Sequence, residues 1–336
     1  LLFSFSLGFT GAGFGRFLIG GSVSVAFVGL LKLSSSWFPR NFYAFVAGNA
    51  LSIGLIGAIS AGPPLRFLVD TFNWRSVILI TGLITLLLGV LIWIFVRDNP
   101  QEKGYSEFTD TIVQPKALSF KGIWNNLFKV IKYRNTLLLL VIPGGIVGCI
   151  LTFSGLWGVP YLVSHHHLSP NKAVTLTSCL LIGWAMGGPF FGWFSDRLGK
   201  RKPIYIAGSI VLTMGWAILL FKQNISFYPL VITLWITGFF SGCIIISFAF
   251  VIESVPRSLS GMVSGLTNMC MMMGPMLLQP IVGKILDIYW SGEVINGVRS
   301  YSLSAYEHSF IPMMGWIVLS VILLFFTKET YCHGID

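Results

Sequence analysis

Nine apolar runs, each long enough to cross a lipid bilayer as a helix, divide the sequence. A spanning helix needs roughly 20 mostly apolar residues. The runs that meet this length lie at 12–37, 41–68, 74–96, 137–164, 172–194, 203–221, 227–252, 261–286 and 308–327. Only 10% of the residues are charged and 54% are hydrophobic, whereas a soluble domain carries about 25% charged residues. The sequence therefore predicts an all-α, polytopic membrane protein whose main solvent is lipid.

The first residues, Leu1 to Leu7, are also apolar but too few to span a bilayer. They lack the basic flank and the cleavage pattern of a signal peptide. We expect them to be the end of a tenth, partial helix that belongs to a longer protein.

Between residues 97 and 136 the chain becomes too polar to cross a membrane. This change predicts three parts: the remainder of an N-terminal helical bundle at 1–97, a basic cytoplasmic linker at 98–135, and a six-helix bundle at 136–336. From Ile123 to Tyr133, apolar residues recur at helical spacing with basic residues between them. This pattern suits either a helix lying on the membrane surface or a solvated basic loop.

The formal net charge of +10 comes from 22 basic and 12 acidic residues. Most of the basic residues lie in every second loop between the apolar runs, and therefore on one side of the membrane, as the positive-inside rule predicts. We therefore expect no nucleic-acid partner. The same bias predicts a cytoplasmic linker and C-terminus, in a plasma membrane such as the bacterial inner membrane.

Gly-Pro pairs occur inside three of the runs, at Gly62-Pro63, Gly188-Pro189 and Gly274-Pro275. Their spacing is regular once the linker is discounted, so the helices are predicted to come in repeated groups of three. Repeated helical units of this kind are typical of secondary transporters. Small residues at four-residue spacing, such as Gly54, Ala58 and Gly62, let helices approach closely in lipid.

A compact polar loop at 192–202 reads G-x-x-x-D-R-x-G-K-R-K. Small residues favour a tight turn between two membrane helices, and the cations favour its cytoplasmic placement. The loop resembles the signature loop of the major facilitator superfamily. Residues 54–64 resemble that family's Gly-Pro motif, and residues 15–21 its Arg-and-Gly motif.

This resemblance implies two helical bundles that alternate between inward-open and outward-open states. It assigns gating or coupling to one set of residues: Arg16, Gly192, Asp196, Arg197, Gly199, Lys200 and Arg201. It assigns helix packing to a second set: Gly54, Ala58, Gly62 and Pro63. For Arg16, the alternative is that the guanidinium reaches the lipid headgroups; for Asp196, it is that the loop only sets topology.

The resemblance also suggests that the first helix of each triplet lines the cargo cavity. Polar and aromatic side chains on these helices, with one on a neighbouring helix, are the cargo-contact candidates: Ser22, Ser24, Thr152, Trp157, Tyr161, Ser241, Ser247 and Asn268. Trp and Tyr also favour the membrane interface, so some of them have a purely structural alternative.

The sequence predicts neither an enzyme nor a cofactor or metal site. Adjacent side chains of His165, His166 and His167 point in different directions on a helix, and no nucleotide or metalloprotease motif is present. We expect a monomeric secondary carrier for a small polar metabolite: an amino acid or peptide, a sugar acid or an organic anion. Proton symport is one coupling mode, although no run holds an Asp or Glu near its centre. Efflux of drugs or siderophores and a non-transporting sensor are the alternatives.

Overall fold

The computed structural model describes residues 1–6, 8–38, 42–60, 63–105, 120–166, 168–222, 225–295 and 297–334. Within them, eight helical segments are long and apolar enough to cross a membrane, which confirms the polytopic all-α class. They contain α1 (Phe9–Trp37), α4 (Trp74–Phe95), α6 with α7 (Arg134–Thr152 and Gly158–His165), α8 (Pro170–Leu198), α9 (Lys202–Phe221), α10 with α11 (Phe227–Ser241 and Ile245–Glu253), α12 (Ser260–Ile288) and α13 (Leu303–Phe325).

The apolar run predicted at 41–68 differs from the other eight. It contains two shorter helices, α2 (Tyr43–Ser60) and α3 (Pro63–Phe72). Pro63 and Pro64 open α3, as suits residues that lack a backbone N–H. Gly62 of the predicted packing motif lies outside the described residues.

The chain folds into two compact units. One comprises Leu1–Arg40 and Ser60–Ile112, and the other Asn41–Ile59 and Val113–Asp336. Helix α2 therefore packs with the second unit. The boundaries predicted from composition, at residues 97 and 135, stay a prediction.

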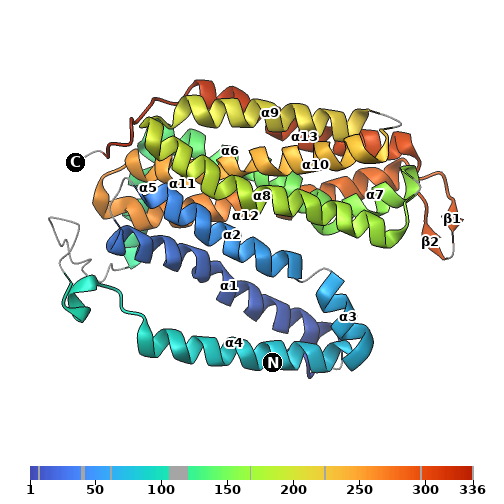
Figure 1. Cartoon of the computed structure of the whole chain (residues 1–336), viewed down its shortest axis with the longest axis horizontal. Helices are drawn as coiled ribbons and strands as arrows, with labels where there is room; N and C mark the ends of the chain where they lie inside the picture. The colour runs from blue at the N-terminus through green and yellow to red at the C-terminus, as the bar shows by residue number, and fades with distance from the viewer. Residues whose placement is uncertain are drawn as a thin grey trace. The chain divides into compact units, whose positions relative to one another are not determined.

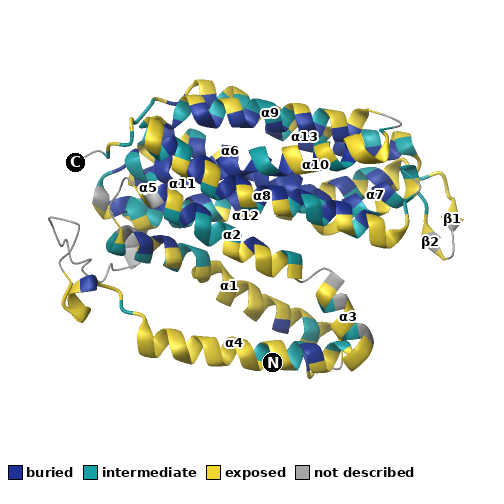
Figure 2. Ribbon diagram, in the orientation of Figure 1, coloured by how far each residue is buried: buried dark blue, intermediate teal, exposed yellow. Residues whose placement is uncertain are grey.

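The first unit holds α1, α3, α4 and a short 3-10 helix, η2 (Pro100–Lys103). The Trp37 indole N–H donates to the Arg97 carbonyl at 3.2 Å, and Lys32 lies 3.7 Å from Asp98. Most side chains of α1 and α4 are exposed, as the yellow ribbon of α4 in Figure 2 shows. Such exposed apolar side chains are favourable where lipid or another part of a protein surrounds them.

The second unit is a bundle in which α6 and the α10–α11 segment are the most buried spans. Figure 1 shows α8 and α10 side by side, and Figure 2 shows many residues of this bundle in the dark blue that marks burial. Helix α6 packs mainly on α12, and α8 on α10. A Cβ on Gly148 would lie 3.0 Å from the Gly274 backbone, so glycine permits the α6–α12 approach.

Within the described residues, some glycines of the small-residue stripes lie against a neighbouring helix and others have no close neighbour. Gly183 and Gly187 face the backbone of α10, as expected of packing residues. Within the described residues, nothing lies within 4 Å of an added Cβ at Gly54, Gly261 or Gly265. In α2, Gly48 does approach another helix. A Cβ added to Gly48 would lie 2.6 Å from the Gly188 carbonyl oxygen.

The basic segment before α6 forms helix α5 (Phe120–Lys132), so the helical alternative is confirmed for this segment. Trp124, Phe128 and Ile131 form an exposed apolar stripe, with exposed Lys129 and Lys132 beside it. Its contact with a membrane surface stays a prediction.

Two spans change helix type along their length. A π-turn, η3 (Phe153–Trp157), joins α6 to α7, and a 3-10 turn, η4 (Gly242–Ile244), joins α10 to α11. A second 3-10 turn, η5 (Arg257–Leu259), precedes α12. The predicted loop after α12 contains a small antiparallel hairpin, β1 (Val294–Ile295) with β2 (Val298–Arg299), which a purely helical prediction misses.

Candidate functional site

The loop between α8 and α9 is a tight turn built on Gly199. This residue ends α8 with φ of +62°, a left-handed conformation that favours glycine, and its N–H donates to the Asp196 carbonyl. Helix α9 starts three residues later at Lys202. The turn thereby brings the side chains of Asp196 and Arg201 onto each other.

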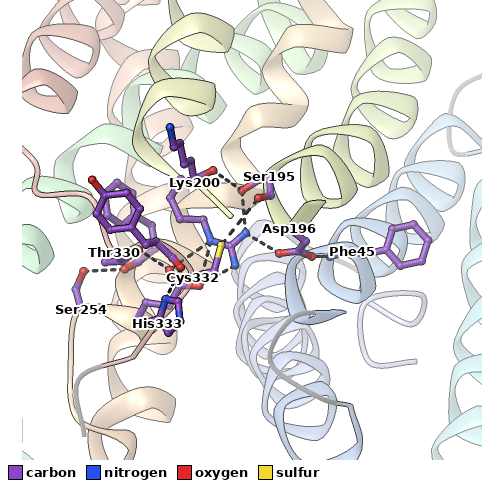
Figure 3. A network of polar contacts seen from close by, with 12 residues as sticks. Phe45, Ser195, Asp196, Lys200, Ser254, Thr330, Cys332 and His333 are labelled. Atoms are coloured by element: carbon purple, nitrogen blue, oxygen red, sulfur yellow. Dashed lines mark hydrogen bonds and ion pairs between the residues drawn. The ribbon is translucent and has the colours of Figure 1, made fainter. Parts of the chain in front are cut away.

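Arg201 is the centre of a polar network (Figure 3) and has no exposed surface. Its Nη1 donates to Asp196 Oδ1 at 2.6 Å and to Ser195 Oγ at 2.8 Å. Its Nε and Nη2 donate to Glu253 Oε1 at 3.0 and 2.7 Å. A buried guanidinium is stable only when it is paired and hydrogen-bonded, and these two carboxylates supply both conditions. The network joins the α8–α9 turn to the end of α11.

The segment after α13 completes the network from another direction. Glu329 accepts the backbone N–H groups of Arg201 and Lys202, each at 2.9 Å. These donors stand at the start of α9, where helical N–H groups lack intrahelical partners and a negative charge is favoured. Thr330 Oγ1 donates to Glu253 Oε2 at 2.5 Å, so the tail contacts both ends of the Arg201–Glu253 pair.

Asn135, at the start of α6, holds the same tail. Its Nδ2 donates to the Lys328 carbonyl and its Oδ1 accepts the Lys328 N–H, both at 2.8 Å. Nδ2 also donates to Ser254 Oγ at 3.0 Å. The Lys202 ammonium adds bonds to the Phe325 and Thr327 carbonyls at 2.8 Å. Helices α6, α9, α11 and α13 therefore meet at one polar cluster.

Asp196 also contacts α2. Its Oδ2 accepts the N–H of Phe45, in the first turn of α2, at 3.1 Å. Helices α2 and α8 approach closely because Gly192 faces the Ala44 carbonyl oxygen. A Cβ added to Gly192 would lie only 2.5 Å from that oxygen. Ser52 Oγ donates to the Ala185 carbonyl further along the same contact. One carboxylate thus bridges a buried arginine and the N-terminus of a second helix.

The polar cluster and its burial shift the pKa values of two groups outside the membrane spans, Arg201 and Cys332. Burial works against the charge on Arg201, but Glu253 and Asp196 together outweigh it and hold the pKa of the guanidinium above its ordinary value. The thiol of Cys332, whose Sγ lies 3.9 Å from the Ser195 carbonyl oxygen, is half-buried. Burial raises the pKa of this thiol to about 11.

The structure brings together several residues that the sequence assigned to gating. Gly192, Asp196, Gly199 and Arg201 meet as described above. Arg197 lies apart, with its guanidinium 5.3 Å from the centre of the Trp193 ring. In Figure 3 the Lys200 ammonium points away from the network.

Residues of the network that were not among the sequence candidates include Asn135, Glu253, Glu329 and Thr330. Glu253 carried a usable signal, since it is an acid at a helix end on the face where the basic residues gather. Glu329 and Thr330 follow the last apolar run without any motif.

Most of the cargo-contact candidates are hydrogen-bonded or buried within their own unit of the described structure. Ser22 and Ser24 donate to the carbonyls of Leu18 and Gly21 within α1. Trp157 donates to the Gln279 carbonyl at 3.0 Å and Tyr161 to the Leu219 carbonyl at 3.3 Å. Three others, Thr152, Ser241 and Ser247, are fully buried. Asn268 is half-buried. Their contact with cargo stays a prediction.

Arg16 lies on the exposed surface of α1, with its guanidinium 4.9 Å from the centre of the Phe3 ring. His165 and His166 pack against Tyr161 at ring distances of 5.5 and 5.8 Å, and His167 lies outside the described residues. Among the described residues, no three His, Cys, Asp or Glu side chains are arranged to hold a metal ion.

The eight apolar helices of spanning length in the described residues, with the paired Asp196 and Arg201 at the α8–α9 turn, define the class of polytopic α-helical membrane proteins. The Major Facilitator Superfamily model matches residues 1–278 and, in a second match, residues 151–331. The chain belongs to the Major Facilitator Superfamily, as the sequence motifs predict.

The relatives include two bacterial proteins named for anionic cargo. The chain is 24% identical over 241 residues to the "Probable nitrate/nitrite antiporter NarK1" of Thermus thermophilus, covering 68% of the chain and 47% of that protein. It is 25% identical to the "Probable galactarate/D-glucarate transporter GudP" of Escherichia coli (strain K12), covering 90% of the chain and 70% of that protein. The chain therefore spans about half of the first relative and about two thirds of the second.

Among solved structures, a variant of the E. coli fucose:proton symporter FucP matches with a TM-score of 0.63. The match has 14% sequence identity and covers 89% of this chain and 72% of that chain. This similarity supports the fold.

Proposed function

We propose that the protein is a secondary active transporter that carries a sugar acid or a similar small organic anion by alternating access. The observation that carries the proposal is the double role of Asp196, which accepts from buried Arg201 and from the N-terminus of α2. Family membership supports the activity, and the names of relatives support the cargo class.

The α2–α8 contact suits a latch that closes and opens. Asp196 reaches α2 through a single backbone hydrogen bond of 3.1 Å, beside close backbone contacts and one hydrogen bond from Ser52 Oγ to the Ala185 carbonyl. The network around Arg201 is much more extensive and holds the α8–α9 turn in place. The turn thus acts as a fixed element, and the contact with α2 as the part that changes during the cycle.

Several relatives are named for anionic cargo. Two GudP proteins are named as probable galactarate/D-glucarate transporters, a Bacillus subtilis relative as a hexuronate transporter, and the Thermus protein as a probable nitrate/nitrite antiporter. Organic anions fall within the cargo range predicted from the sequence. Arg16 is the proposed cation for binding or coupling, and H⁺ the proposed coupling ion.

The test is uptake of labelled D-glucarate and D-glucuronate into proteoliposomes that contain the full-length carrier. We expect uptake of at least one sugar acid, inhibition by an excess of unlabelled sugar acid, and loss of accumulation when a protonophore removes the pH gradient. A panel of amino acids, nitrate and lipophilic dyes runs in parallel. Transport confined to nitrate or to dyes would overturn the sugar-acid assignment, and saturable binding without transport would overturn the carrier activity.

A further inference from the structure

An apolar groove of about 440 Å³ opens between α8 and α9 beside the turn at Gly199. Phenyl rings of Phe190, Phe191, Phe194 and Phe240 line it, with Ala207 on α9 and Lys200 from the turn. Ala207 and Lys200 are exposed. The groove therefore combines an aromatic wall with one cationic residue.

Lys200 differs from the other cations of its loop. Arg201 forms ion pairs with Asp196 and Glu253. The Lys202 ammonium donates to two carbonyls of the segment after α13, and the Arg197 guanidinium lies over the Trp193 ring. Within the described part of the chain, the Lys200 ammonium has no hydrogen bond or ion pair, and Figure 3 shows it directed away from the network. Its backbone carbonyl accepts Ser195 Oγ at 3.2 Å, which fixes the position of the residue.

These features fit one chemical class of ligand. The groove lies at the ends of two membrane-spanning helices, and from Pro203 to Gly208 it follows α9 for about 7.5 Å. A hydrocarbon chain matches phenyl walls of this depth, and a phosphate group matches a lysine at the level where the helices leave the membrane. A polar metabolite would find no donor or acceptor among the phenylalanine side chains.

We propose that this groove binds one acyl chain of an anionic phospholipid and that Lys200 pairs with the headgroup phosphate. The site lies outside the latch formed by Asp196 and α2, and its occupancy does not require transport. Since the Lys200 carbonyl bonds to Ser195, and Ser195 accepts from Arg201, the lipid would sit two contacts from the central arginine.

The experiment is native mass spectrometry of the full-length carrier in detergent, titrated with phosphatidylglycerol or phosphatidylcholine of the same chain length. One lysine at a membrane surface contributes about 1 kcal/mol toward an anionic lipid, which is about fivefold in affinity. We therefore expect the wild-type protein to retain phosphatidylglycerol about fivefold better than phosphatidylcholine. Lys200→Gln should bring this ratio close to one.

Lys222→Gln is the matched control, because Lys222 stands at the opposite end of α9. It should keep the wild-type ratio. Ala207→Phe should fill the groove and weaken both lipids, whereas Ile218→Phe, at an exposed position further along α9, should weaken neither. Each variant is compared with the wild type for its melting temperature without added lipid.

Three results would overturn the proposal. The first is a wild-type protein without preference for phosphatidylglycerol, and the second is the same loss of preference in the Lys200 and Lys222 variants. The third is displacement of phosphatidylglycerol by inorganic phosphate or by a free fatty acid, which would indicate a different ligand. Because the readout is lipid retention, failure here leaves the proposed sugar-acid transport untouched.

Discussion

Nη2 of Arg201 and Oε1 of Glu253 lie 2.7 Å apart and join the turn after α8 to the last residue of α11. The arginine is fully buried and the glutamate is 11% exposed, so water screens the pair weakly. A second carboxylate, Asp196, shares the arginine from the other side at 2.6 Å.

Glu253→Gln should destabilise the protein, since it leaves buried Arg201 with only one anionic partner. Breaking a buried ion pair lowers the free energy of unfolding by about 3–5 kcal/mol when no other partner remains. Because Asp196 stays paired with Arg201, we expect a decrease near the lower end of this range. The melting temperature in detergent should fall clearly. Asp287→Asn, which alters an exposed pair with Arg299, is the control and should leave the melting temperature nearly unchanged. Equal stability of the two variants would contradict the role of Glu253.

Asp196→Asn should slow the transport cycle more than it weakens cargo binding. An amide can accept from Arg201 or from the Phe45 N–H through its oxygen, but its nitrogen accepts from neither. Loss of one charge-assisted hydrogen bond corresponds to a change of about tenfold. Initial rates of uptake should therefore fall by about that factor while the Kd for cargo is retained. A parallel loss of rate and binding would place Asp196 in the cargo site instead.

Glu329→Ala should lower stability by about 1 kcal/mol, the usual effect of removing a helix cap. The carboxylate accepts the first free N–H groups at the start of α9, and alanine leaves both without that acceptor. Glu329→Gln keeps an acceptor oxygen and should recover part of the loss. Chemical denaturation in mild detergent measures the difference, with exposed Glu293→Ala as the control. A Glu329 variant as stable as the control would show that the cap contributes nothing.

Gly192→Ala should separate α2 from α8, because the new methyl group would meet the Ala44 carbonyl. The hydrogen bond from Phe45 to Asp196 should then lengthen, and the latch should close less often. A cysteine introduced at Phe45 reports the change as faster labelling by a water-soluble maleimide. Gly54→Ala, at a position without close neighbours in the described structure, should label at the parent rate. Slower labelling in the Gly192 variant would run against this account.

Cys332 should react slowly with maleimides at neutral pH. Burial raises the pKa of its thiol to about 11, whereas an ordinary cysteine titrates near 8.5. The thiol is therefore neutral below its raised pKa, and the reactive thiolate appears only as the pH rises toward 11. In a variant that keeps Cys332 as the only cysteine, the labelling rate should increase tenfold per pH unit between about 8 and 10. A plateau near pH 9 would show that the tail does not shield the thiol.

Hydropathy alone predicted the helical class and most of the spans, because the need to pair every backbone group in lipid leaves few other folds. The run 41–68 shows the limit of this approach. Composition cannot distinguish one long helix from α2 followed by α3, since Pro63 and Pro64 suit a bend as well as a helix start.

The site was predictable only where its residues stand close in the sequence. Asp196, Gly199 and Arg201 fall within one short loop, so their pattern was visible. Glu253 and Glu329 reach the same arginine from the ends of other helices, and a pairing of that kind depends on how the bundle packs. The packing role of the stripe around Gly54 stays a prediction for a related reason: spacing identifies small residues, but not the helix that lies opposite them.

The tail that carries Glu329, Thr330 and Cys332 is threaded into the polar cluster. An affinity tag or fluorescent reporter spliced directly behind His333 would pull on this segment and on α9 with it. Recombinant forms of the carrier should therefore carry such a label behind a generous spacer, or at another place in the chain.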